Sequence, residues 1–295
     1  MKLFFTTVSL LLMYSCKAQP AADLKTNTDN NTLLWEVSGN GLAAPSYIFG
    51  TFHLLCKQDI NFSNSLKQAF TRADTIYMEL DMDDPSILLG GLMMMNMKNG
   101  KKLKDLYKPD EYKRVEAFFK DSLQTSLVLF QSMKPLLLTA LIYPKLMPCN
   151  TVSGVEEELM KLAKEKDKQI KGLETLTFQS SVFDSIPYEK QAEEMLKTID
   201  SLSTSKLYFD SMMLAYKNQD MKLMETLLAN EDFGMTDNQD ILLDKRNRNW
   251  VEQLKTIMKN GSVFTAVGAG HLLGKTGVIE LLRKEGYAVR PIVNK

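Results

Sequence analysis

Histidine is almost absent from this sequence, with two in 295 residues, and cysteine is scarce, with three. Lysine plus arginine and aspartate plus glutamate both total 36, so the net charge is zero. Without a basic field or basic patches interleaved with aromatics, the chain has no signature of nucleic-acid binding. The Gly-x-Ser-x-Gly elbow of serine hydrolases and the His-x-x-x-His spacing of zincins are also missing. These absences exclude a nucleic-acid-binding protein, a serine hydrolase of that type and a zincin.

Apolar runs long enough to cross a membrane are missing as well. Residues 3–14 form an apolar run of about a dozen residues after Lys2, which is too short to span a bilayer and is typical of a targeting signal. Residues 133–146 are apolar but contain Pro135 and Pro144, which favours a buried helix. We expect residues 1–18 to be a signal peptide, 19–31 a flexible tether and 32–295 the folded domain.

The end of the targeting segment is similar to a bacterial lipobox. Residues 13–16 end in Ser15 and Cys16, and this pattern predicts that Cys16 carries lipid and becomes the mature N-terminus. Cleavage after Ala18 is the alternative. Both predict export across the cytoplasmic membrane to the periplasm or cell surface, and the first adds an anchor in the outer or cytoplasmic membrane.

The two histidines share one sequence context. Residues 47–53 and 264–271 are each an apolar, strand-like run that ends in Gly-x-x-His. Glycine tolerates positive φ, so a strand can turn sharply there. We therefore expect His53 and His271 at the mouth of a sheet, where open α/β proteins bind their ligands.

Three carboxylates have comparable positions. Residues 75–80 read as a strand that carries Glu79 near its end, and residues 169–173 as a strand that ends at Glu174. Glu156 opens a helix, a position that the helix dipole alone also explains. If these strands share one sheet with their carboxyl ends on one side, the acids and both histidines reach the same rim.

Imidazoles and carboxylates can together hold a divalent cation, such as Mn²⁺, Co²⁺ or Zn²⁺. Carboxylates packed closely repel one another unless a cation or protons intervene. Arg246 and Asn247 lie on a helix at 241–259, where a polar side chain on the apolar face needs specific partners. The predicted catalytic residues are His53, Glu79, Glu174 and His271; the predicted metal ligands are these four and Glu156; Gln179, Arg246 and Asn247 are predicted to orient the substrate. Which acid ligates and which acts as a base stays open.

Cys56 and Cys149 allow three interpretations. They can form a disulfide in an oxidising compartment, or they can be plain buried cysteines. Cys56 also follows His53 by three positions, which is compatible with a metal ligand.

Strand-like segments cluster near the two histidine motifs, and long helical segments separate them. The pattern predicts an α/β fold with a central mixed sheet, in two pseudo-related halves, with helical insertions over 85–150 and 180–245. An apolar content of 44% and a charged content of 24% are ordinary for a globular protein.

Six motifs occur in an order that resembles the TraB/GumN family, which also includes the Tiki metalloproteases. They are Gly50–His53, Glu79, Gly154–Glu156, Gly172–Thr175 with Gln179, Arg246–Asn247, and Val267–Gly274. The resemblance covers about residues 33–295. It implies an α/β fold with one site built from both halves and, for the Tiki branch, metal-dependent peptide cleavage. Glu156 departs from the aspartate of many bacterial members.

We therefore expect a divalent-metal-dependent hydrolase that acts on peptides, or on another small-molecule substrate, outside the cytoplasm. The alternative is a non-catalytic surface protein that binds metal or haem on the same scaffold. A surface interaction protein with a decayed site is a third hypothesis. Retention of both histidines, the acids, Gln179, Arg246 and Asn247 argues against it.

Overall fold

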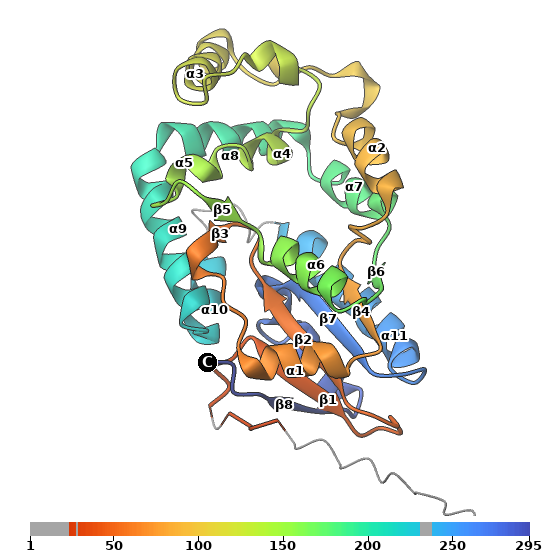
Figure 1. Cartoon of the computed structure of the whole chain (residues 1–295). Coiled ribbons are helices and arrows are strands. Elements are labelled where there is room, and N and C mark those ends of the chain that lie inside the picture. Colours follow the sequence, from red (N-terminus) through yellow and green to blue (C-terminus); the bar gives the residue numbers. More distant parts are fainter. Residues whose placement is uncertain (1–23, 28, 231–237) are drawn as a thin grey trace, which may run out of the picture.

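A six-stranded mixed sheet organises the fold of this computed structural model (Figure 1), in the strand order β6-β4-β7-β2-β1-β8. The structure describes residues 24–27, 29–230 and 238–295; the predicted signal peptide and Cys16 lie outside the described residues. The strands of this sheet are β1 (Leu34–Ser38), β2 (Ser46–Thr51), β4 (Thr75–Met78), β6 (Ile170–Gly172), β7 (Val263–Gly268) and β8 (Ala288–Pro291).

One edge of the sheet is antiparallel. β1 pairs with β2 on one side and with β8 on the other. The β1–β2 connection contains Gly39, Asn40 and Gly41 at φ of 76°, 47° and 79°, the left-handed conformation that glycine and asparagine tolerate best. This turn makes a hairpin, which sets the register of β2 against β1.

The other four strands are parallel. β2 pairs with β7, β7 with β4, and β4 with β6. The two Gly-x-x-His strands, far apart in the chain, are thus direct neighbours. The two predicted halves contribute to a single sheet, and its parallel strands end at one edge.

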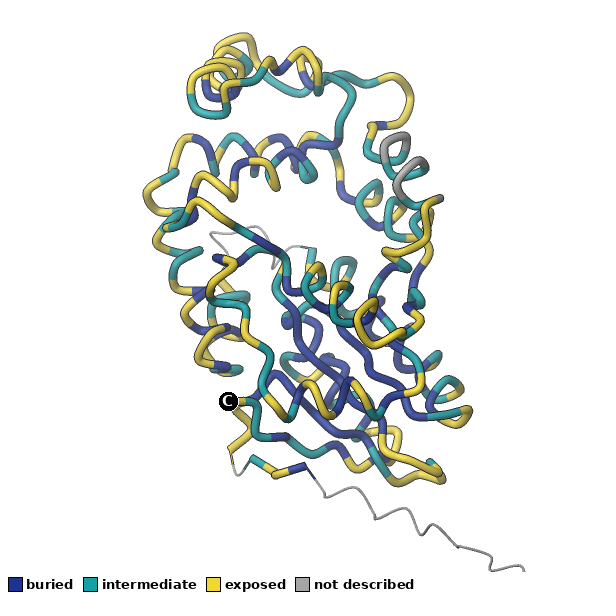
Figure 2. The backbone as a smooth tube through the Cα atoms, in the orientation of Figure 1, coloured by how far each residue is buried: buried dark blue, intermediate teal, exposed yellow. Residues whose placement is uncertain are grey.

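Side chains on the strands alternate between two apolar layers. Phe264 and Ala266 face a cluster with α1 (Asn64–Arg72), α6 (Val155–Glu165) and α9 (Leu202–Lys217). Val263 and Val267 face a second cluster with α11 (Lys245–Ile257) and α12 (Val278–Lys284). Figure 2 shows the strands as the most continuously buried part of the chain. Burial on both faces explains why these strands read as continuous apolar runs.

Two helix boundaries follow local rules. Ser63 caps α1 by accepting a hydrogen bond from the Leu66 N–H at 3.0 Å. The helix predicted at 241–259 begins as an α-helix at Lys245, after a π-helical turn over Asp240–Asp244. That turn precedes Arg246, so it bears on where the arginine points.

The predicted insertions are helical and pack on one another. A third apolar cluster joins residues 97–142 to residues 195–199 and contains no strand residue. In Figure 1 these helices lie beyond the edge where the parallel strands end. No helix within the described ranges is both long and apolar enough to cross a membrane. The helices here are α2 (Pro85–Met94), α3 (Pro109–Asp121), α4 (Pro135–Thr139), α5 (Tyr143–Leu146), α7 (Leu176–Asp184) and α8 (Tyr188–Asp200). The helix α10 (Met221–Leu228) instead lies beside the sheet, with Met224 in the first apolar cluster.

The last residues of the predicted tether are part of the fold. Val293 N–H donates to the Lys25 carbonyl at 2.8 Å, and Asn27 N–H donates to the Pro291 carbonyl at 2.9 Å. Leu24 is buried in the core. The predicted flexible segment is therefore too long at its C-terminal end, because its backbone pairs with the last residue of β8 and with the residues that follow it.

Candidate functional site

The four parallel strands deliver the predicted residues to one edge of the sheet. His53 follows β2, His271 follows β7, and Glu79 comes directly after β4. Glu174 follows β6, and its N–H donates to the Glu79 carbonyl at 2.9 Å, which extends the β4–β6 pairing past both strands. The topology therefore produces the convergence that the strand-end positions predicted.

Space beside Gly268 brings three of these side chains together. A Cβ added at Gly268 would lie 3.4 Å from Glu79 Oε1, 3.6 Å from His271 Cδ2 and 4.0 Å from His53 Nε2. The Gly268 N–H itself donates to Glu79 Oε1 at 2.9 Å. The second Gly-x-x-His glycine thus leaves room where both rings and one carboxylate meet.

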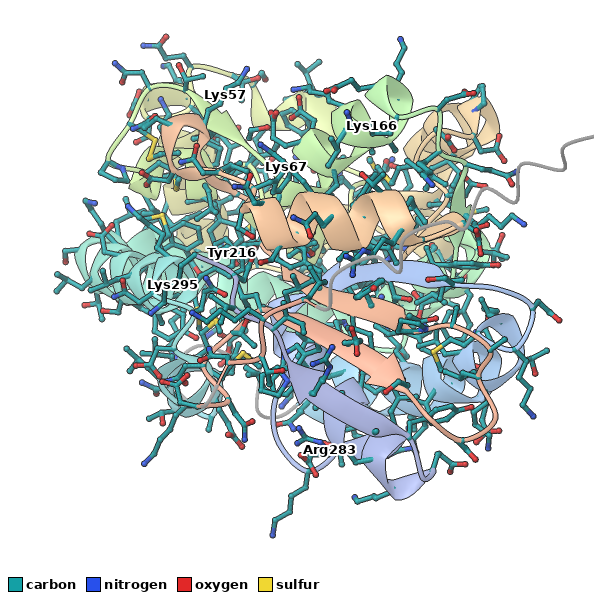
Figure 3. All side chains as sticks on the ribbon, turned by 60° about the horizontal axis from the view of Figure 1, so that its bottom comes forward. Lys57, Lys67, Lys166, Tyr216, Arg283 and Lys295 are labelled. Atoms are coloured by element: carbon teal, nitrogen blue, oxygen red, sulfur yellow. A yellow bond between two sulfur atoms is a disulfide. The ribbon has the colours of Figure 1, made fainter. Side chains whose placement is uncertain are left out.

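The reason predicted for these glycines is wrong. Gly268 has a φ of −50°, and Gly50 is not among the glycines with positive φ. A Cβ at Gly50 would lie 2.9 Å from Leu272 Cδ1 and 3.0 Å from Leu33 Cδ2. Tyr216 of α9, labelled in Figure 3, donates a hydrogen bond from its hydroxyl to the Gly50 carbonyl at 2.9 Å. Close packing, and not a left-handed turn, requires glycine at Gly50, whereas a Cβ at Gly268 would make only ordinary contacts with the site residues.

His271 is buried and its tautomer is determined by its neighbours. Asn247 Nδ2 donates to the Thr276 carbonyl at 2.9 Å, so Asn247 Oδ1 faces His271 Nδ1 at 2.6 Å. An amide oxygen only accepts, so His271 Nδ1 carries the proton and Nε2 has a lone pair. Burial lowers the pKa of His271 to about 3, with the Arg246 guanidinium acting in the same direction. The ring is therefore neutral near pH 7.

Arg246 lies at the centre of the cluster. Its Nε and Nη2 donate to the two oxygens of Glu174 at 2.8 and 2.9 Å, and Nη2 also donates to Glu79 Oε2 at 2.6 Å. Nη1 lies 3.2 Å from His271 Nε2, the lone-pair nitrogen. Trp250, one helical turn further on, packs against both groups. Its ring centroid lies 4.3 Å from the His271 ring centroid and 4.8 Å from Arg246 Cζ. Arg246 and Asn247, predicted to orient the substrate, thus have partners inside the site.

The two carboxylates beside Arg246 differ in their ionisation. Burial raises the pKa of Glu79, but His271, Arg246 and His53 outweigh it and lower that pKa to about 2. Burial raises the pKa of Glu174, whose side chain is fully enclosed, despite its two bonds to Arg246. Glu79 is therefore the acid that is firmly ionised at the mouth of the site.

His53 differs from His271 in being open to solvent. Its side chain is 77% exposed, and Nδ1 lies 2.8 Å from Glu156 Oε1, as an ion pair and not a well-aligned hydrogen bond. The Glu156 carboxylate raises the pKa of His53 to about 9, although water around the exposed ring weakens the attraction. Burial opposes ionisation of Glu156, but His53 lowers its pKa overall.

Glycine and a disulfide hold the His53 loop against the start of α6. The Val155 N–H donates to the Phe52 carbonyl at 3.0 Å, and a Cβ at Gly154 would approach the His53 carbonyl to 2.9 Å. The short strands β3 (Leu55–Cys56) and β5 (Val152–Ser153) pair antiparallel directly after His53. A disulfide joins Cys56 to Cys149, which decides among the three interpretations of these cysteines.

Gln179 lies on α7, shortly after Glu174. No side-chain hydrogen bond joins it to the histidines or acids in the part of the chain that the structure describes. One supporting residue was not predicted from the sequence, Thr276, whose carbonyl accepts the Asn247 amide. Trp250 is a further supporting residue, and its position four residues after Arg246 is the spacing that brings side chains together on one face of a helix.

In metal-free protein the two histidines should titrate at opposite ends of the pH range. His53 should lose its proton only as pH rises through about 9, whereas His271 should stay neutral down to about pH 3. Long-range ¹H–¹⁵N NMR resolves this directly, because the chain has only two histidines. The pKa of His53 is raised above its ordinary 6.5 by Glu156. The stability that the His53–Glu156 ion pair contributes is therefore complete below pH 6.5 and is lost as pH rises through about 9.

Glu156→Gln is the matched control for this titration. It should return the His53 pKa towards 6.5 and leave His271 unchanged. If His271 titrated between about pH 5 and 8, as an unperturbed histidine does, the neutral Nδ1–H tautomer would be refuted.

Comparison with protein families gives one decisive match. The family model described as the TraB/PrgY/gumN family matches residues 33–291. This chain belongs to the TraB/PrgY/gumN family. The match confirms the predicted family and includes every residue of the cluster described above.

Curated relatives of this family member are distant. The chain is 22% identical to metalloprotease TIKI2 of Danio rerio over 88% of this chain and 61% of that protein. It is 22% identical to metalloprotease TIKI1 of Homo sapiens over 93% of this chain and 64% of that protein. It is 23% identical to metalloprotease TIKI2 of Xenopus tropicalis over 90% of this chain and 60% of that protein. The chain thus spans less than two thirds of the length of these relatives. No solved structure matches it significantly.

The names of these relatives imply a metal, and the TraB/PrgY/gumN site has suitable donors for one. Both rings have Nδ1 beside an oxygen, Glu156 Oε1 or Asn247 Oδ1, as metal-binding histidines usually do. His271 Nε2 lies 3.8 Å from Glu79 Oε1. Yet in residues 24–27, 29–230 and 238–295 no group of three or more His, Cys, Asp or Glu side chains is arranged to hold an ion. The donor types therefore fit a metal, and in the arrangement described here His271 Nε2 lies 3.2 Å from Arg246 Nη1.

Proposed function

We propose that this chain is a divalent-metal-dependent hydrolase that cleaves peptide bonds. The observation that carries the proposal is the pair of imidazoles at one sheet edge, each with Nδ1 beside an oxygen and Nε2 on the side of Glu79, where His271 Nε2 is in contact with Arg246 Nη1. The naming of distant relatives as metalloproteases supports it. Imidazole and carboxylate ligands suit Zn²⁺, Mn²⁺ and Co²⁺.

Each residue has a distinct role in this proposal. His53 Nε2, His271 Nε2 and Glu79 would hold the ion, while Glu156 and Asn247 hold the two rings. When bound, such an ion supplies Lewis acidity and a nucleophilic water near neutral pH. Glu174 is enclosed and uses both oxygens on Arg246, so its role is to hold that arginine.

Substrate would approach from the His53 side. His53 is the open member of the cluster, whereas the His271 side chain is 5% exposed. Gln179 lies on α7 just past Glu174 and has an amide free of bonds to the cluster, so we propose that it orients the peptide. Glu79, ionised and next to both rings, is the acid placed to ligate or to take a proton at that face.

Metal removal tests this function. Chelator-treated protein should lose hydrolysis of a peptide library, and Mn²⁺, Co²⁺ or Zn²⁺ should restore it, because the nucleophile depends on the ion. Protein that binds a metal stoichiometrically but cleaves no peptide would instead support the non-catalytic alternative. Protein that binds none of the three would contradict the metal site itself.

We also propose that the mature chain works outside the cytoplasm, anchored by lipid on Cys16. The Cys56–Cys149 disulfide supports an oxidising compartment. Mass spectrometry of the native protein should find a lipid-modified N-terminal Cys16 and a disulfide-linked Cys56–Cys149 peptide. An unmodified N-terminus at Gln19 would replace the anchor with simple secretion.

A further inference from the structure

Arg246 uses its whole hydrogen-bonding capacity inside the site. A guanidinium has five N–H donors, and each has an acceptor here: one oxygen of Glu79, two of Glu174, the Leu242 carbonyl at 3.0 Å and His271 Nε2. The side chain is 7% exposed. It therefore has no N–H left for a substrate in this arrangement.

Charge explains why an arginine is buried at this point. The Glu79 and Glu174 carboxylates share the guanidinium, and His271 is neutral. Without the cation that they share, the Glu79 and Glu174 carboxylates would repel each other strongly in this enclosed position. Arg246 supplies the positive charge that the sequence pattern led us to expect from a metal.

The bond to His271 has a second consequence. A lone pair that accepts an N–H from Arg246 is not available to a metal. Since Asn247 keeps the proton on Nδ1, Nε2 is the only nitrogen of that ring that can ligate. An ion can reach the ring only when the Arg246 Nη1 contact opens.

We propose that Arg246 is a built-in cation that holds Glu79, Glu174 and His271 in place in the metal-free protein and competes with the divalent ion for His271 Nε2 and Glu79. It is thus a positioning residue that sets metal affinity. This inference rests on the proposed metal-dependent function. It adds that the arginine stabilises the empty site and weakens binding of the ion.

Three variants test the inference. Arg246→Met keeps the length of the side chain but removes the charge and all five donors. Arg246→Lys keeps the charge but removes the planar fork. Arg248→Met is the matched control, since Arg248 lies on the same helix with its side chain 51% exposed and pairs with Asp240 at 3.0 Å.

There are two readouts. The first is chemical unfolding of chelator-treated protein, and the second is titration of that protein with Mn²⁺ or Zn²⁺, with binding measured by calorimetry. Arg246→Met should unfold at a lower denaturant concentration without metal. It should bind the ions roughly tenfold more tightly or better, because a positive charge next to a divalent ion has been removed. Arg246→Lys should also bind more tightly than wild type, by a smaller factor, and Arg248→Met should match wild type in both measurements.

Each outcome separates this inference from the proposed function. If wild type binds metal and folded Arg246→Met binds it equally or more weakly, Arg246 supports the ion and the competition is refuted. If Arg246→Met does not fold, Arg246→Lys decides the same question. If no variant binds either ion, the metal-dependent function and the competition both fail. The metal-free unfolding difference between Arg246→Met and Arg248→Met still tests the role of Arg246 in holding the carboxylates.

Discussion

Replacing His53 or His271 by alanine is expected to remove both metal binding and peptide hydrolysis. Both rings present Nε2 to the same space beside Glu79 and Gly268, so either substitution removes a ligand from one shared site. The loss of metal affinity should exceed the roughly 10–100-fold that follows loss of an outer-shell partner. Metal content and peptide hydrolysis of the two purified variants are the measurements.

Asn247→Ala provides a graded comparison. It leaves both rings present but removes the oxygen that holds His271 Nδ1, so it should fall in the roughly 10–100-fold range. His53→Ala removes an exposed ring and its ion pair with Glu156, so chemical unfolding of the variant separates lost chemistry from lost folding. A folded His53→Ala or His271→Ala protein that retained full metal and full activity would refute the shared site.

Loss of the Cys56–Cys149 disulfide should have the largest effect on stability. The bond closes a loop across a sequence separation of 93 that includes the first helical insertion. Loops of this size restrict the unfolded chain strongly, and removing a native disulfide typically costs about 2–5 kcal/mol of unfolding free energy. Denaturant unfolding of a Cys56→Ser/Cys149→Ser double variant measures the change.

Activity should fall in the same variant, since the bond lies three residues after His53 and ties its loop to the segment that leads to Glu156. Wild type treated with reductant is the control and should match the double variant in both stability and activity. Equal denaturation midpoints for the variant and oxidised wild type would show that β3–β5 pairing and the helical packing hold this region without the bond.

Local features of the sequence predicted the elements closely. The strands predicted at 75–80 and 169–173, which the structure has as β4 and β6, depend on patterns within about a dozen positions. The strand-end positions of His53, His271, Glu79 and Glu174 follow from the same local patterns. The family match and the α/β sheet confirm what these patterns indicated.

The sequence alone did not reveal how these residues are paired. Arg246 is 167 positions from Glu79 and 72 from Glu174, and no local rule assigns partners over such separations. Asn247, on the apolar face beside Arg246, was predicted to need specific partners, and the structure pairs Asn247 with His271 and Arg246 with the two acids. The disulfide likewise depended on bringing two loops together.

What the sequence by itself determined is the inventory: two strand-end histidines, strand-end acids, and an arginine and an amide on a buried helical face. Only the tertiary structure decided which of them touch. The parallel register of β2, β7, β4 and β6 places four strand ends at one edge, and the packing of α11 on that sheet inserts Arg246 between the carboxylates. The physical reason is that propensity and capping act within a few residues, whereas burial of charge is satisfied between segments that only the folded sheet brings together.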